Sequence, residues 1–359
     1  MVNLAARVTV DTAALKHNLR VVRDRAPGAR VMAVIKANAY GHGLVAAARA
    51  LADAEAFAVA RLEEAVSLRN AGLSNRIVLL EGVFHPDQLP RASALGLDVV
   101  VHSPGQLAML EAADLPEPVS VWLKVDTGMN RLGVRPGDAG DAVRRLAACA
   151  SVAAPVRFMT HLACADERDG VFTDRQLQVF DEALAGLEGE RSIANSAGLL
   201  WRADARADWV RPGIMLYGAS PFSGGAGRDL GLKPVMRLAS SVISVKDVRA
   251  GERVGYGGTW EAPRDARIAI AAIGYGDGYT RHLGSGTPVM IRGETRPLAG
   301  RVSMDMIAVD ITDAPAVRVG DEVVLWGEGI AVEELARRAG TIPYELLCGV
   351  TQRVAVTVV

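Results

Sequence analysis

The sequence predicts an α/β protein, with an N-terminal (β/α)8 TIM-type barrel followed by a C-terminal, mostly β domain. Eight short apolar runs alternate with helix-spaced segments over the first two-thirds of the chain, as parallel sheets require. A Gly- and Ser-rich stretch, 218–231, then interrupts this alternation. Beyond it, apolar runs are separated by turn residues rather than helices. We therefore expect a barrel over 11–230, and a strand-rich domain formed by 231–359 together with 1–10.

The eight apolar runs are the expected strands of the barrel. They are 31–35, 56–60, 76–80, 98–101, 119–125, 156–160, 191–194 and 209–216. The segments between them carry apolar residues at helical spacing, for example Leu44, Ala47, Ala48 and Leu51. A doubly wound open sheet has the same alternation, so the strand count favours the barrel without excluding that alternative.

The C-terminal third is expected to contain six strands and one helix. The strands are predicted at 234–248, 267–273, 287–292, 306–311, 321–326 and 351–359. A helix is predicted at 331–339. The N-terminal run Ala6–Val10 has the composition of a strand, and we expect it to join this domain.

Composition excludes several classes of protein. In 359 residues, 40 Lys and Arg nearly cancel 41 Asp and Glu, which leaves a net charge of −1. This balance argues against a nucleic-acid-binding or polybasic membrane-surface protein. Three cysteines are too few and too scattered for a disulfide framework or a zinc site, and they fit a reducing compartment. Neither a secretory signal nor an apolar run of about 20 residues is present, so we expect a cytoplasmic enzyme.

Lys36 directly follows the first predicted barrel strand, in the segment AVIKANAYGHG. Barrel enzymes carry their chemistry at this end of their strands. A lysine there can bind a carbonyl cofactor covalently, although a single lysine at a strand end is more often simply solvated. Further polar side chains close later strands and should meet at the same barrel mouth. They are Lys124, Asp126, His161, Asn195, Ser196 and Arg211.

A phosphate site is also predicted near the last strands. The Ser196 hydroxyl and the backbone N–H groups of Gly213 and Ile214 lie where barrels often bind phosphate. Glycine at position 213 allows a close approach of the backbone. The alternative for Ser196 is a simple helix cap.

These motifs resemble those of the alanine racemases. AVIKANAYGHG resembles their pyridoxal 5'-phosphate (PLP) lysine motif, and the likeness continues in order through both predicted domains. Further matching motifs are KVDTGMNRLG, THLACAD, ANSAG, VRPGIMLYG, VGYGGTW, IGYGDGY, GRVSMDM and PYELLCG. The C-terminal motifs distinguish a racemase from shorter PLP-carrier barrels, which lack that domain. An arginine at position 211 argues against the amino-acid decarboxylases of similar plan, which carry an acidic residue there.

The resemblance implies a role for each matching residue. Lys36 binds PLP and acts as one of two bases, and Tyr256 is the opposite base, supplied by the partner subunit of a homodimer. Arg211 contacts the pyridine nitrogen, and His161 links Tyr256 to Arg211. The cofactor phosphate is bound by Tyr40, Ser196, Gly213, Ile214 and Tyr344, and Asn195 lies among the cofactor-binding residues.

The substrate and its surroundings follow from the same resemblance. Arg131 lies beside the PLP phenolic oxygen and the substrate carboxylate, and Lys124 matches a lysine that often carries a carbamate. Met304 and Asp305 match partner-chain residues at the carboxylate, while Tyr275 and Tyr344 narrow the access channel. We expect interconversion of L- and D-alanine, for peptidoglycan synthesis or alanine catabolism. A racemase preferring serine or a broader range of amino acids remains an alternative, and so does a non-catalytic PLP carrier. Asn130 and Gly276 stand where relatives commonly have glycine and alanine.

Overall fold

The computed structural model describes residues 5–167 and 169–359. It contains two compact units, which we call the barrel unit (Leu15–Leu216) and the β unit (Met1–Ala14 with Tyr217–Val359). The boundary lies at Leu216, whereas the sequence placed it at 230. Glu333 gives the physical reason, because its buried carboxylate accepts hydrogen bonds from the backbone N–H groups of Ser220 (2.8 Å) and Gly227 (2.7 Å). These bonds attach the Gly-rich segment to the β unit.

The barrel unit contains a closed eight-stranded parallel barrel, in which β2 pairs with β9 to complete the ring. Closure excludes the open-sheet alternative. The strands are β2 (Arg30–Val34), β3 (Ala56–Val59), β4 (Arg76–Leu79), β5 (Leu97–Val101), β6 (Val119–Lys124), β7 (Val152–Met159), β8 (Arg191–Ser192) and β9 (Trp209–Val210). Apolar residues such as Met32, Phe57 and Val78 have no exposed surface, as a barrel with a packed interior requires.

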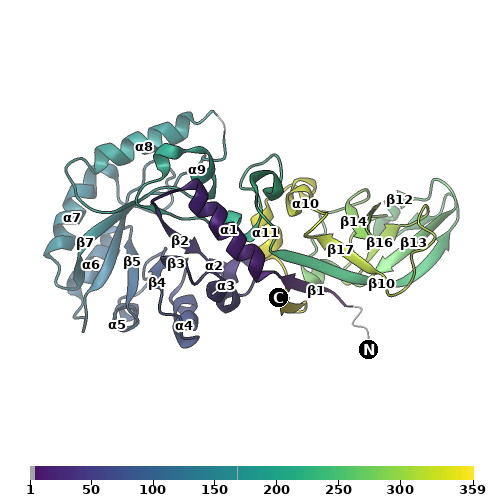
Figure 1. The fold of residues 1–359 in the computed structure, drawn as a ribbon, viewed down its shortest axis with the longest axis horizontal. Coiled ribbons are helices and arrows are strands. Elements are labelled where there is room, and N and C mark those ends of the chain that lie inside the picture. Colours follow the sequence, from purple (N-terminus) through teal and green to yellow (C-terminus); the bar gives the residue numbers. More distant parts are fainter. Residues whose placement is uncertain (1–4, 168) are drawn as a thin grey trace. The chain divides into compact units, whose positions relative to one another are not determined.

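Helices surround these strands (Figure 1). They are α1 (Thr12–Arg25), α3 (Leu44–Ala50), α4 (Leu62–Asn70), α5 (Leu89–Ala94), α6 (Pro104–Ala112), α7 (Ala139–Ala148), α8 (Val171–Ala183) and α9 (Ser196–Trp201). A short element, α2 (Lys36–Tyr40), directly follows β2. The predicted strand 209–216 is wrong in its length, since β9 ends at Val210. Pro212 has no N–H to donate to a sheet, and a 3-10 turn, Ile214–Tyr217, follows.

The β unit is centred on an eight-stranded sheet. Its strands are β1 (Arg7–Val10), β10 (Met236–Val248), β13 (Ala266–Ala271), β14 (Pro288–Ile291), β15 (Glu294–Pro297), β16 (Ile307–Asp310), β17 (Glu322–Trp326) and β18 (Ala355–Val358). The N-terminal strand pairs with β10 and β18, which confirms that this segment joins the C-terminal domain. The long strand β10 also pairs with β13 and β17.

Three features of the β unit differ from the sequence prediction. The hairpin strand β15 and the two-stranded pair β11 (Arg253–Val254) and β12 (Trp260–Glu261) were not predicted. The expected single helix is α10 (Val332–Ala339), but a second, α11 (Pro343–Cys348), follows it. The predicted strand 351–359 is wrong in its length, because only Ala355–Val358 pairs.

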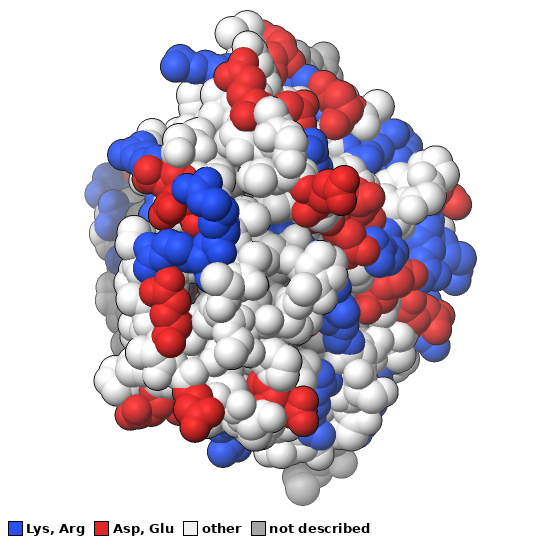
Figure 2. Space-filling model, turned by 90° about the vertical axis from the view of Figure 1, so that its left-hand side faces the viewer, with Lys and Arg blue, Asp and Glu red and all other residues white. Residues whose placement is uncertain are grey.

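Acidic and basic side chains are interspersed on the molecular face drawn in Figure 2, where no broad area carries a single sign. This agrees with the net charge of −1. Within the described residues, no helix combines the length and the apolar character needed to span a membrane.

Candidate active site

Lys36 lies at the carboxyl end of β2 and begins an unusual turn. The next four residues, Ala37 to Tyr40, all have φ between 53° and 54°, in the left-handed region. Such a conformation costs an L-residue roughly 1–2 kcal/mol, and none of the four is glycine. Consecutive strained residues persist only when their surroundings hold them, and they concentrate at functional sites. This turn therefore marks Lys36 as a functional position independently of any motif.

Hydrogen bonds from neighbouring elements hold the turn. The Glu64 carboxylate of α4 accepts from the Ala37 N–H at 2.7 Å and from the Ala60 N–H at 2.8 Å. His42 Nδ1 lies 2.9 Å from both the Ala39 and Tyr40 carbonyl oxygens. Burial lowers the pKa of this imidazole to about 4, so it is neutral at physiological pH and donates from Nδ1. Sequence reasoning missed both Glu64 and His42 as supports of the lysine.

Positive charge gathers at the barrel mouth. Lys124 ends β6 and is 8% exposed, and its pKa is lowered to about 8. Burial is the main cause, followed by repulsion from Arg211, Arg131 and Lys36, while Asp126 opposes the shift. Burial lowers the pKa of His161 well below its usual value. The positive charges of Arg211, Lys124, Arg131 and Lys36 lower it further. The structure thus brings Lys36, Lys124, Arg131, His161 and Arg211 together, as the barrel prediction required.

Arg211 is the most constrained of these cations. Its Nη1 donates to Ser192 Oγ at 2.7 Å, and Nη2 donates to the carbonyl oxygens of Thr160 and Ile193. Burial lowers its pKa to about 10, which still leaves the guanidinium charged at neutral pH. Nη2 also lies 3.5 Å from His161 Nδ1. Because a neutral imidazole accepts on one nitrogen and donates from the other, this contact leaves Nε2 of His161 as the donor.

Ser196, Gly213 and Tyr40 form a small polar cradle. The Gly213 N–H donates to Ser196 Oγ at 2.9 Å, and the Met215 N–H lies 3.5 Å from the same oxygen. A Cβ on Gly213 would lie 2.5 Å from Tyr40 Oη, so glycine is needed for the tyrosine hydroxyl to approach the backbone. Asn195 is the residue that caps α9, accepting from the Gly198 N–H at 3.0 Å and donating to the Leu162 carbonyl oxygen at 3.2 Å. The helix cap is therefore Asn195 and not Ser196.

The mouth fits an anionic cofactor. Four cations converge on it, and Asp126 is the one acid among the five largest influences on the Lys124 pKa. Hydroxyl and N–H groups of Tyr40, Ser196 and Gly213 lie within a few ångströms of one another, an arrangement that suits a phosphate. The residues present therefore match a small dianionic phosphate ester better than a metal ion. Within the described ranges, no group of three or more His, Cys, Asp or Glu residues could hold a metal.

The loops after β6 and β7 are joined by a buried glutamine that sequence reasoning missed. Gln176 of α8 donates to Thr127 Oγ1 and to the His161 carbonyl oxygen, both at 3.1 Å, and accepts from the Ala163 N–H at 2.8 Å. The only sign of its role in the sequence was that Gln176 lies in a segment between two predicted strands whose apolar residues have helical spacing. In the first of these loops, Asn130 has φ 55°, which explains why glycine is common there, since asparagine also tolerates this region.

The β unit groups the remaining predicted residues. Tyr256 is 65% exposed, Tyr275 38% and Met304 52%. The Tyr275 N–H donates to the Ser303 carbonyl oxygen at 3.0 Å, which places this tyrosine beside the Met304 segment. Asp305 accepts a 2.8 Å hydrogen bond from Arg353 Nη2. Tyr344 lies on α11 and is half-buried.

Gly276 has a structural role that its sequence position did not reveal. A Cβ there would lie 2.5 Å from Arg353 Nη1 and 3.1 Å from the Met304 carbonyl oxygen. Glycine at this position therefore leaves room for the arginine that contacts Asp305.

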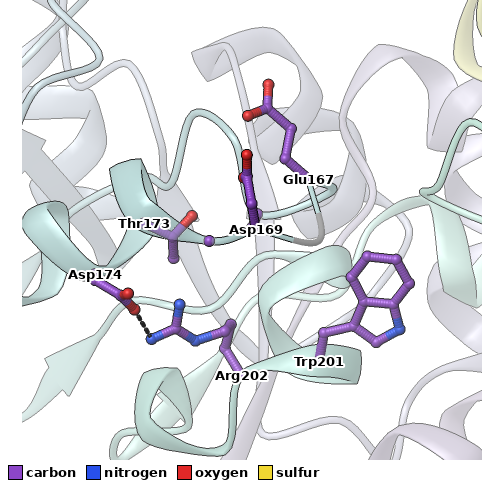
Figure 3. Close-up of a pocket in the computed structure, with 8 residues that line it drawn as sticks. Glu167, Asp169, Thr173, Asp174, Trp201 and Arg202 are labelled. Atoms are coloured by element: carbon purple, nitrogen blue, oxygen red, sulfur yellow. Dashed lines mark ion pairs between the residues drawn. The ribbon is translucent and has the colours of Figure 1, made fainter.

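A separate cavity of about 450 Å³ lies in the barrel unit beside the loop that follows β7 (Figure 3). Its lining includes Glu167, Asp169 and Trp201, and residue 168 lies outside the described residues. Arg202 pairs with Asp174 at 2.5 Å across one side, and with Asp204 at 2.6 Å. None of the residues predicted for the site lines this cavity, and its main cation is already paired, so we do not assign the chemistry to it.

Comparison with known proteins agrees with this geometry. The family model described as "Alanine racemase, N-terminal domain" matches residues 10–221, and "Alanine racemase, C-terminal domain" matches residues 235–358. The chain belongs to the alanine racemase family. This membership confirms the resemblance, the predicted barrel with its β domain, and the expected amino-acid racemase class.

Individual members of the family are similar over their whole length. The chain is 50% identical to an alanine racemase of Vibrio parahaemolyticus over 350 residues, 98% of each protein. It is 50% identical over 352 residues to a biosynthetic alanine racemase of Escherichia coli O6:H1, again over 98% of each. The crystal structure of biosynthetic alanine racemase from Pseudomonas aeruginosa superposes with a TM-score of 0.96 at 46% identity, covering 99% of both chains.

Proposed function

We propose that this protein interconverts L- and D-alanine with two bases, Lys36 and Tyr256, acting on opposite faces of the substrate. The observation that carries the proposal is Lys36 itself, which begins a strained left-handed turn inside a mouth of buried cations. The second unit, matched by the family's C-terminal model, argues against a PLP carrier that consists of a barrel alone. A role in peptidoglycan synthesis fits the biosynthetic relatives.

Pyridoxal 5'-phosphate is the proposed cofactor, and when bound it makes the Cα proton of alanine acidic by drawing electron density away from that carbon. Lys36 would bind it covalently. The cradle of Tyr40, Ser196 and Gly213, with the Ile214 N–H, would bind its phosphate. Tyr344 and Asn195 complete the proposed cofactor-binding set, Asn195 by capping the helix that carries Ser196.

Arg211 is proposed to donate a hydrogen bond to the pyridine nitrogen without losing its proton. Its guanidinium is anchored to Ser192, Thr160 and Ile193, and stays charged at neutral pH despite a lowered pKa of about 10. His161 accepts from Arg211 on Nδ1, so its Nε2–H is available to the phenolic oxygen of Tyr256. This arrangement favours the phenolate form, because a hydrogen bond to the charged oxygen stabilises it.

Lys124 is proposed to carry a carbamate. Its pKa of about 8 leaves an appreciable neutral fraction near physiological pH, and the neutral amine is the form whose nitrogen bonds to the carbon of CO2. The amine proton goes to water, and a buried cation beside Arg131 and Arg211 becomes an anion that attracts both. Intact-protein mass measurement tests this: an added CO2 that is lost on acidification supports it, and an unmodified lysine at high CO2 contradicts it.

A homodimer with shared sites is the proposed assembly. Tyr256, Met304 and Asp305 are exposed on the β unit, and the proposal has each chain present them to the barrel mouth of its partner, where Arg131 also contacts the substrate carboxylate. Tyr275 and Tyr344 would narrow the substrate channel. Exchange of Lys36→Ala and Tyr256→Phe subunits in equal amounts should then restore about a quarter of the normal specific activity. No recovery after proven exchange would contradict the sharing of sites.

The first experiment is to add L-alanine to the purified, PLP-loaded protein and to separate the enantiomers of the product. D-Alanine formation, lost in both Lys36→Ala and Tyr256→Phe, supports the proposal. A protein that binds PLP but forms no D-alanine contradicts it. A panel including serine and basic amino acids then tests substrate breadth, since one methylene in an apolar pocket changes selectivity by only about 1–3 kcal/mol. We also propose a cytoplasmic location, which the scattered cysteines favour.

A further inference from the structure

Arg281 lies near two tyrosine rings on the β unit. Its guanidinium carbon is 5.9 Å from the ring centroid of Tyr256 and 5.8 Å from that of Tyr275. Nη1 donates a 2.8 Å hydrogen bond to the Val302 carbonyl oxygen, which fixes the position of the guanidinium. The arrangement is therefore a charged group that the backbone fixes within cation–π distance of both rings.

We propose that Arg281 is a positioning residue that orients the Tyr256 ring for proton transfer. This inference rests on the proposed function, in which Tyr256 is one of the two bases. A cation within about 6 Å of a ring centroid is attracted to the electron-rich face of the ring. The arginine side chain is suited to this role because it stays charged throughout the working range.

Tyr275 also takes part in this arrangement, although the proposed function assigns it only to the access channel. Its ring also lies within cation–π distance of the guanidinium, and its backbone is fixed by the hydrogen bond to Ser303. Tyr256 begins an exposed 3-10 turn, Tyr256–Gly258, directly after Gly255. The residue is 65% exposed, so packing fixes little of the ring. Arg281 thus supplies orientation at an otherwise exposed phenol ring.

The test compares the holoenzyme with Arg281→Met, which removes the charge and keeps an unbranched side chain, and with Arg281→Lys, which keeps the charge. Arg264→Met is the matched control, since Arg264 is an exposed arginine of the same unit that pairs with Asp313. We expect Arg281→Met to lower kcat roughly 3- to 30-fold with little change in KM, as loss of a cation–π contact implies. Arg281→Lys should recover part of this loss.

Isotope effects distinguish this role from a merely structural one. L- and D-alanine have equal free energies, so kcat/KM falls equally in both directions and cannot reveal which base is impaired. With Cα-deuterated substrates, Arg281→Met should raise the isotope effect for the enantiomer whose proton Tyr256 removes and lower it for the other. Isotope effects unchanged in both directions would overturn the inference, whatever the change in rate.

A second readout needs neither cofactor nor turnover. With 13C-labelled tyrosine rings, the Tyr256 ring signals should report greater ring mobility in Arg281→Met than in Arg264→Met. Equal ring mobility in the two variants would contradict the inference. If Arg281→Met does not fold, Tyr275→Leu takes its place, because it removes the second ring and should shift the isotope effects in the same direction.

Failure of this inference is separable from failure of the proposed function. Racemisation that survives in Lys36→Ala or Tyr256→Phe overturns the two-base proposal itself. Loss of racemisation in those variants, with Arg281→Met equal to Arg264→Met in both isotope effects, overturns only the role of Arg281.

Discussion

The two units differ in how they present their proposed catalytic groups. In the barrel unit, Arg211 is 4% exposed and Lys124 8%, and hydrogen bonds from several strands fix the arginine. In the β unit, Tyr256 is 65% exposed, and its ring centroid lies 5.9 Å from the Arg281 guanidinium carbon. The barrel side is therefore organised by its own core, whereas the β side is a surface. The comparison teaches that substitutions of equal catalytic effect should differ widely in their effect on stability.

The largest expected contrast is between Arg211→Leu and Tyr256→Phe. Both should abolish racemisation. Arg211→Leu leaves the Thr160 and Ile193 carbonyl oxygens and the Ser192 hydroxyl without their charged donor, and should lower the free energy of unfolding by about 3–5 kcal/mol. Tyr256→Phe removes one exposed hydroxyl and should change it by less than about 0.5 kcal/mol. Urea denaturation measures both, and equal destabilisation would contradict the contrast.

The pH dependence of stability should be strongest in the barrel unit. Buried His42 has a pKa of about 4, against 6.5 for an unburied histidine, so the unfolded chain binds a proton that the folded chain does not. The stability that neutral His42 contributes is fully present above pH 6.5. Up to about 3 kcal/mol of the free energy of unfolding is lost as the pH falls toward 4. His42→Gln does not titrate and should flatten this part of the profile. An unchanged acid limb in urea titrations would contradict the assignment.

Lys124 should also make the free energy of unfolding rise with pH, but in the alkaline range. In CO2-free buffer its folded pKa is about 8 against 10.5 for an unburied lysine, so the unfolded chain again binds the additional proton. Stability should rise between about pH 8 and 10.5, and Lys124→Met should be more stable than the parent at pH 7. Added CO2 should reduce this difference, if a carbamate relieves the repulsion. A parent profile that is flat in this range would contradict the low pKa.

Two glycines at which an added Cβ would come equally close to a neighbouring side chain sharpen the comparison further. A Cβ at Gly213 or at Gly276 would lie 2.5 Å from a neighbouring side chain. At Gly213 the neighbour is buried Tyr40, which cannot move freely, so Gly213→Ala should cost about 1–3 kcal/mol and weaken PLP retention. At Gly276 it is exposed Arg353, so Gly276→Ala should cost less than about 1 kcal/mol. Gly137→Ala, with open space around it, is the control, and equal costs would contradict the argument.

The smallest expected effect is a gain of stability. Ala37→Gly places a residue that tolerates positive φ at an exposed position with φ 53°, where no buried methyl is lost. Relief of the left-handed strain exceeds the entropy cost of glycine by about 0.5–1 kcal/mol. The free energy of unfolding should rise by that amount, while kcat falls because Lys36 is held less rigidly. As a control, Ala46→Gly in the right-handed helix α3 should instead lower the free energy of unfolding.

The sequence predicted those parts of the fold and site that depend on local pattern. Buried apolar runs located the barrel strands, and the polar residue after each located the mouth, as Lys36 and His161 illustrate. The shortness of β9 was missed because Trp209–Val210 continues into an apolar run, although Pro212 interrupts pairing. Gln176 and Glu64 were missed because polar residues on helices usually face water, and only tertiary structure shows what they bond.

The left-handed run after Lys36 could not be predicted, since alanine favours the right-handed helix. It has a consequence for the order of folding. Four successive left-handed residues are rare in an unfolded chain, so this turn should be absent from early folding intermediates and form only when Glu64 and His42 close around it. Substitutions within it should then alter the unfolding rate more than the folding rate. Lys36, the proposed base, would be set in place last, after the barrel that surrounds it has closed.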